Sequence, residues 1–195
     1  LLLPVYSLFM IANVTFYIFV DNYLTSAFGY GVIGGSVAML VIGFALATSS
    51  TFLVNPAQER FGKRTLVVAS LAIMVVCSIA FAFSPVAILS FIPIFLFYFT
   101  FGVSYPTLLG LFSGSVGEAE QGWIMGVTTA IFCLAGGVMS LAGGGLMSLS
   151  IRSPYYISAL AAALGLIVMA LTWGTPVIRK LTARSPRNGE VDQSD

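Results

Sequence analysis

Long apolar runs alternate with short polar segments along the chain, and the length of each run limits what it can form. Residues 65–117 contain no Asp, Glu, Lys or Arg. As one α-helix this stretch would be about 80 Å long, more than twice a hydrocarbon core of about 30 Å. We therefore predict that the chain turns back once within this stretch, at Ser84-Pro85.

The same division, at about 20 apolar residues per membrane crossing, applies to the rest of the chain. The predicted spans are about 3–25, 31–54, 66–83, 87–111, 122–149 and 154–174. Each should be a helix, because a bilayer offers peptide groups no water and the alternating pattern of a membrane barrel strand is missing. The sequence predicts an all-α, polytopic membrane protein: a six-helix transmembrane unit over 1–174 and a mobile cytoplasmic tail over 175–195.

The composition agrees with a membrane protein. Hydrophobic residues make up 58% of the chain and charged residues 8%, whereas an average soluble domain has about 25% charged residues. So few charges cannot cover the surface of a soluble protein.

The sequence lacks the usual parts of an enzyme active site. It has no His, and Cys77 and Cys133 each stand alone in an apolar run, where Cys is usually a packing residue. The spans hold no paired acids or nucleophile and base, and the chain has no phosphate-binding Gly-Lys-Ser/Thr loop or basic, aromatic nucleic-acid surface. We expect no enzyme activity, catalytic residue, metal, cofactor or nucleic-acid partner.

The basic residues predict the orientation in the membrane. Arg60, Lys63 and Arg64 follow the second span, four more basic residues lie in the tail, and the opposite face has only Arg152. Since positive residues stay cytoplasmic, both ends of the chain should face the cytoplasm. The expected location is the cell (inner) membrane, with the lipid bilayer as a partner.

Polar side chains within the spans are the candidates for solute contact. Tyr6, Asn13, Tyr17 and Asp21 are seven, four and four residues apart, which places them on one face of a helix. Such a stripe should face water or other helices. Asp21 lies about 6 Å from the expected outer boundary. It could therefore couple transport to a proton or cation, or it could be a hydrated residue at the membrane interface.

Two spans contain residues that weaken helices. Pro93 and Pro106 lie within the fourth span, and each removes a backbone hydrogen bond. The fifth span contains Gly143, Gly144 and Gly145, each worth about 1 kcal/mol less helix stability than Ala. We expect these helices to bend there.

The charge cluster at residues 55–64 predicts a short loop at a membrane face, and this segment resembles a known signature. It contains Gln58-Glu59-Arg60-Phe61-Gly62-Lys63-Arg64. This run resembles the major facilitator superfamily pattern G-x-x-x-D-R-x-G-R-R, which joins the second and third helices of each half of those transporters. Asn55 replaces the first Gly and Glu59 replaces the Asp. Residues 102–106 also resemble the Gly/Pro pattern of helix ten, and residues 120–126 resemble the start of helix eleven.

The resemblance implies more about the fold and the site. The chain would be helices seven to twelve, the C-terminal six-helix half, built from two inverted three-helix repeats. Its partner would be an N-terminal six-helix half. Helices seven and ten would border the central cavity, so that Asn13, Tyr17 and Asp21 would face Tyr98 and Tyr105.

The segment with the signature could also control conformation. Arg60, Lys63 and Arg64 cannot enter the bilayer cheaply, and Gly62 permits a tight reversal. Positive-inside topology does not require Glu59, which could pair with an Arg or a helix N-terminus in one conformer only. We hypothesise a conformational latch, with a plain topology anchor as the alternative.

These features together predict secondary active transport by alternating access. The aromatic, charge-poor helices favour a small lipophilic solute and proton-coupled efflux, similar to drug:proton antiporters, with a proton or another ion as partner. One alternative is a non-transporting sensor or scaffold on the same fold, which would not need the polar stripe. Another is a uniporter or symporter of a polar metabolite.

Overall fold

The computed structural model describes residues 2–114 and 116–172. The predicted tail at 175–195, with its four basic residues, therefore lies outside the described residues. The described elements are α1 (Leu2–Phe28), α2 (Gly31–Thr48), the π-helix η1 (Ser49–Leu53), α3 (Val54–Ala82), α4 (Ala87–Ser113), the short 3-10 helix η2 (Glu118–Glu120), α5 (Gln121–Leu149) and α6 (Ser153–Thr172). Over these residues there is no strand, which confirms the predicted all-α fold.

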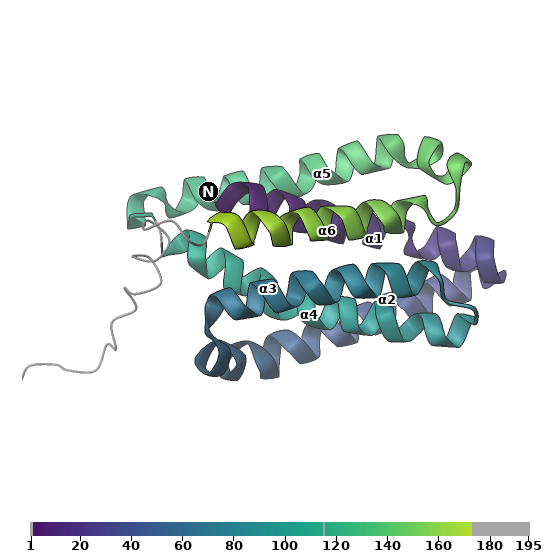
Figure 1. Cartoon of the computed structure of the whole chain (residues 1–195), viewed down its shortest axis with the longest axis horizontal. Helices are drawn as coiled ribbons and strands as arrows, with labels where there is room; N and C mark the ends of the chain where they lie inside the picture. Colours follow the sequence, from purple (N-terminus) through teal and green to yellow (C-terminus); the bar gives the residue numbers. More distant parts are fainter. Residues whose placement is uncertain (1, 115, 173–195) are drawn as a thin grey trace, which may run out of the picture.

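The long helices lie side by side along the long axis of the molecule (Figure 1). Five stretches in the described part are long and apolar enough to cross a membrane, and the longest of them is Gly31–Ala82. This stretch joins α2, η1 and α3, and it is interrupted at Gly62, whose φ of 67° and ψ of 148° are not helical. Beyond Gly62, α3 runs back against α4 (Figure 1).

The helical state of residues 55–61 corrects the sequence analysis, which predicted a loop over 55–64. The backbone is helical from Val54 onward and leaves the helical region only at Gly62. Pro56 lies three residues after the end of the π-helix η1, and a local π-turn is one of the adjustments by which a membrane helix accommodates a proline. The next residues include Ala57, Gln58 and Glu59, which are good helix formers. The reversal therefore depends on the left-handed φ of Gly62, a conformation that glycine adopts without strain.

The other helix connections are short. Gly29 and Gly31, both with positive φ, end α1 and begin α2. The predicted turn at Ser84-Pro85 is present between α3 and α4, because the residue before a proline avoids the helical region. Apolar runs and breaker residues thus determine most helix ends.

An aromatic core lies where α1, α3, α4 and α6 meet. Phe16 stacks on Phe97 with ring centroids 4.3 Å apart, and Phe81 packs edge-on against Tyr155 at 4.7 Å. All four rings are fully buried. This core holds α1 and α4 in fixed positions, and both helices contribute to the pocket described next.

A buried chain of hydroxyl groups joins the same side of the bundle. The Oγ of Ser158 on α6 donates to the carbonyl oxygen of Ala12 on α1 at 2.8 Å. It also lies 3.1 Å from the Oγ of Ser78 on α3. Interhelical hydrogen bonds of this kind stabilise membrane bundles, so α1, α3 and α6 are tied together at one level.

Candidate functional site

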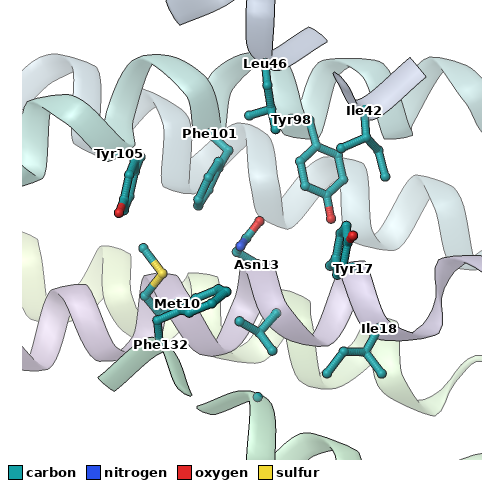
Figure 2. Close-up of a pocket in the computed structure, with 12 residues that line it drawn as sticks. Met10, Asn13, Tyr17, Ile18, Ile42, Leu46, Tyr98, Phe101, Tyr105 and Phe132 are labelled. Atoms are coloured by element: carbon teal, nitrogen blue, oxygen red, sulfur yellow. The ribbon is translucent and has the colours of Figure 1, made fainter. Parts of the chain in front are cut away.

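A pocket of about 450 Å³ lies between α1, α2, α4 and α5. Its walls are mainly aromatic and aliphatic (Figure 2). The residues that line this central pocket are Met10, Asn13, Val14, Tyr17, Ile18, Ile42, Leu46, Tyr98, Phe101, Tyr105, Phe132 and Gly136. The volume falls within the range of about 300–1,000 Å³ that is usual for small-molecule sites.

Four of the five predicted cavity residues line this pocket together. Asn13 and Tyr17 come from α1, and Tyr98 and Tyr105 come from α4. The spacings of four and seven residues place each pair on one side of its helix. Phe101 also lines the pocket and was not predicted, although it lies between the two tyrosines at helical spacing and could have been found from that position.

Two polar atoms of the central pocket have no partner among the described residues. They are the Oδ1 of Asn13 and the hydroxyl of Tyr98. Asn13 is only 7% exposed and Tyr98 only 2%. Figure 2 shows both groups among the side chains that surround the pocket. Since buried polar atoms nearly always find a hydrogen-bond partner, these two are the candidates in the wall for contact with a bound molecule.

Stacked rings fix the wall contributed by α4. The ring of Phe101 lies 5.5 Å from that of Tyr105 at an interplanar angle of 14°. The ring of Phe101 also stacks on that of Phe9 on α1, with centroids 5.0 Å apart and an interplanar angle of 7°. The stack therefore gives the pocket a flat apolar surface of defined orientation.

Asp21 is the predicted cavity residue that does not line the central pocket. Its side chain is exposed, and its carboxylate lies against the backbone of Gly35 on α2. A Cβ atom at Gly35 would overlap the Oδ1 of Asp21. The structure thus places Asp21 at the contact between α1 and α2, one helical turn beyond Tyr17.

The predicted latch segment contacts α4 through a residue that the sequence analysis did not single out. Glu59 and Arg60 are exposed, and Lys63 is half-buried. Gln58 donates from Nε2 to the Oγ1 of Thr107 at 2.9 Å. This bond joins the start of α3 to the pocket-lining helix.

A comparison with protein families decides the class of the molecule. The family model of the Major Facilitator Superfamily matches residues 2–191. The chain belongs to the Major Facilitator Superfamily. No curated protein and no solved structure matches the chain.

Membership in the superfamily confirms the family predicted from residues 55–64. Together with the five apolar helices of the described part, it confirms an integral, multi-pass membrane protein whose general function is membrane transport. The central pocket is therefore a candidate solute site in a superfamily transporter.

Pro106 has a clear backbone consequence in this superfamily member. Proline has no N–H, so the carbonyl four residues earlier, that of Gly102, loses its helical donor. The Oγ of Ser50 in η1 donates to this carbonyl at 3.3 Å. A bond from a neighbouring helical segment thus replaces the missing one. α4 is helical throughout Ala87–Ser113, including Pro93 and Pro106, and bending there stays a prediction.

The glycine run in α5 is helical as well. Gly143 is buried against Phe19, whose Cζ would lie 2.9 Å from a Cβ added at this glycine. Gly144 and Gly145 have nothing within 4 Å of such an atom. Close packing explains the first glycine of the run, and the predicted bending at all three stays a prediction.

Proposed function

We propose that this protein is a secondary active transporter that moves a small lipophilic solute by alternating access. The observation that carries the proposal is the central pocket: an aromatic-walled space of about 450 Å³ between four helices of a superfamily transporter. No Asp, Glu, Lys or Arg is among the residues that line it. An anionic or strongly polar metabolite would find no charged partner there, which favours a lipophilic solute over the polar-metabolite alternative.

We propose that the chain crosses the membrane six times. Gly62 divides the stretch Gly31–Ala82 into a part of 31 residues, 31–61, and a part of 20 residues, 63–82, and each part reaches the length of about 20 residues that a membrane crossing needs. The chain would then be the C-terminal half of the transporter, built from two inverted three-helix repeats, with an N-terminal half as its partner. It would lie in the cell (inner) membrane with both of its ends on the cytoplasmic side. The segment at 55–64, with Glu59, Arg60, Lys63 and Arg64, would be the conformational latch.

Proton-coupled efflux is the proposed mode of transport, and Asp21 is the candidate coupling residue. Its carboxylate lies at the contact between α1 and α2, and both helices line the central pocket. A change in its protonation would alter this contact and so could bias one conformer. A hydrated interfacial Asp21 is the competing explanation for its exposed side chain.

The proposal is tested by flux of a panel of lipophilic solutes, with and without a pH gradient, in proteoliposomes that contain this chain together with the proposed N-terminal half. Gly136→Phe should fill the central pocket and abolish flux. Gly137→Phe is the matched control, because Gly137 is exposed and has open space around it, and it should keep flux near the wild-type rate. Correctly inserted protein that moves no solute would favour the sensor or scaffold alternative. Flux that is indifferent to the pH gradient would remove proton coupling but keep transport.

A further inference from the structure

Buried Ser and Thr side chains elsewhere in the described bundle have hydrogen-bond partners within the protein. The Oγ1 of Thr107 donates to the carbonyl oxygen of Val103 at 2.7 Å. The Oγ of Ser104 donates to that of Ser70, and Ser158 donates to Ala12. These Ser and Thr hydroxyl groups, which lie away from the central pocket, are therefore satisfied within the protein.

The Oδ1 of Asn13 and the hydroxyl of Tyr98 break this pattern, and both belong to the central pocket. The hydroxyl of Tyr155 is a third unpartnered group, but Tyr155 does not line the pocket. An unpartnered buried group destabilises the empty site, and a ligand that supplies the partner removes this penalty. The carboxamide oxygen of Asn13 can only accept a hydrogen bond, whereas the Tyr98 hydroxyl can donate or accept.

The charge of the ligand follows from the other residues of the wall. Because the lining contains no Asp, Glu, Lys or Arg, a charged ligand would have to leave water without a counter-ion from this chain. The aromatic rings of Tyr17, Tyr98 and Tyr105 could attract a cation, but this attraction is weaker than the cost of removing a charge from water. An uncharged ligand is therefore favoured.

We propose that the central pocket selects an uncharged aromatic solute that carries a hydrogen-bond donor, with Asn13 as the residue that recognises the donor. This inference rests on the proposed function, because it concerns the ligand of the same pocket. The aromatic part lies against the wall formed by Phe101 and Tyr105, and the donor pairs with the Oδ1 of Asn13. The hydroxyl of Tyr98 forms a second hydrogen bond when the solute group can also accept one.

The test compares two probes with the same bicyclic ring system. 2-Naphthol carries a hydroxyl donor, and methylation removes that donor in 2-methoxynaphthalene. Binding to the full chain in lipid nanodiscs is measured by equilibrium dialysis, with empty nanodiscs subtracted to correct for partition into lipid. If apolar burial alone governed binding, the more lipophilic ether would bind more tightly. We expect the opposite order in the wild type, with a preference for 2-naphthol of about tenfold.

Three variants assign this preference to particular atoms. Asn13→Leu keeps the size of the side chain but removes the acceptor, and it should reverse the preference in favour of the ether. Tyr98→Phe removes a hydroxyl that can donate to the oxygen of either probe, so it should weaken the binding of both probes and leave the preference largely unchanged. Tyr155→Phe is the matched control, since it removes an unpartnered buried hydroxyl outside the pocket, and it should leave both affinities unchanged. Circular dichroism and gel filtration establish that each variant is folded.

Several outcomes would overturn the inference. These are absence of saturable 2-naphthol binding, a wild type that prefers the ether, an unchanged preference in Asn13→Leu, or tighter binding of 2-naphthyltrimethylammonium than of 2-naphthol. Tyr98→Phe alone still tests the hydroxyl contacts if Asn13→Leu fails to fold. Solute flux without a preference for 2-naphthol would remove this inference and keep transport. The preference without any flux would keep the inference and remove transport.

Discussion

Replacement of Gly102 by Ala should disrupt a close contact between α4 and η1. Gly102 is buried, and a Cβ added there would overlap the Oγ of Ser49. The next nearest atoms, the Cβ of Ser49 and the Oγ of Ser50, would both lie 3.3 Å away. The added methyl group would therefore displace the Ser49 hydroxyl from its bond to the Leu46 carbonyl or force η1 away from α4. In the second case the hydrogen bond from Ser50 to the Gly102 carbonyl would lengthen.

The expected net loss is about 1–2 kcal/mol of unfolding free energy. Overpacking of a filled contact costs about 1–3 kcal/mol. The gain in helix propensity from Gly to Ala recovers at most about 1 kcal/mol. Because Tyr98, Phe101 and Tyr105 lie within about one turn of Gly102 on α4, the displacement should also weaken solute binding to the central pocket.

Denaturation of the purified protein in mixed micelles, followed by circular dichroism, measures the change in stability. Gly110→Ala is the matched control, because Gly110 lies on the same helix with nothing within 4 Å of an added Cβ. It should be neutral or slightly stabilising. Ser49→Ala removes the atom nearest to the added methyl group, so the double variant Gly102→Ala/Ser49→Ala should recover much of the loss.

The steric explanation would be refuted if Gly102→Ala were as stable as the wild type. Equal destabilisation by Gly110→Ala would also refute it, because the effect would then belong to α4 in general. A third contrary result is strict additivity of the Gly102 and Ser49 substitutions, since atoms that overlap must show an interaction energy.

Further predictions concern polar groups on other helices. Asn13→Leu should leave the free energy of unfolding unchanged or raise it, because it removes an unpartnered buried group. Ser158→Ala should lower the free energy of unfolding by about 1 kcal/mol, because it removes two hydroxyl contacts. Denaturation in mixed micelles measures both changes. Asp21→Asn should abolish the response of flux to a pH gradient while solute exchange without a gradient continues, and full proton-driven flux would exclude Asp21 from coupling. Gln58→Leu should speed amide hydrogen exchange over residues 55–61 by about 2–10-fold through loss of the bond to α4. Unchanged exchange would show that this bond does not hold the segment.

Apolar patterning predicted the all-helical fold and the turn at Ser84-Pro85, because both follow from local chemistry. A run without charges has to be buried or membrane-embedded, and proline limits where a helix can continue. The same approach failed at residues 55–61. Their charge indicated a loop at the membrane surface, but a charged segment with good helix formers can stay helical there. Only Gly62 needed the backbone of a turn.

The candidate site was predictable in position but not in detail. The stripe on α1 identified Asn13 and Tyr17 because helical periodicity alone places them together. Whether a polar atom has a partner depends on the neighbouring helices, so the unpartnered Oδ1 of Asn13 could not be inferred from sequence spacing. The position of Asp21 depends in the same way on how closely α2 approaches α1 at Gly35. The sequence does not reveal this approach, because Gly35 is only one of several glycines in α2.

The hydroxyl chain behind α1 has a consequence for recognition. Ser158 donates a hydrogen bond to the carbonyl of Ala12, and the next residue, Asn13, lines the central pocket and has a buried, unpartnered acceptor. The acceptor is thus preorganised on a helix that is bonded to α6, which is itself bonded to α3. A solute that reaches Asn13 would not need to order this helix first, so less of its binding energy would be lost to entropy.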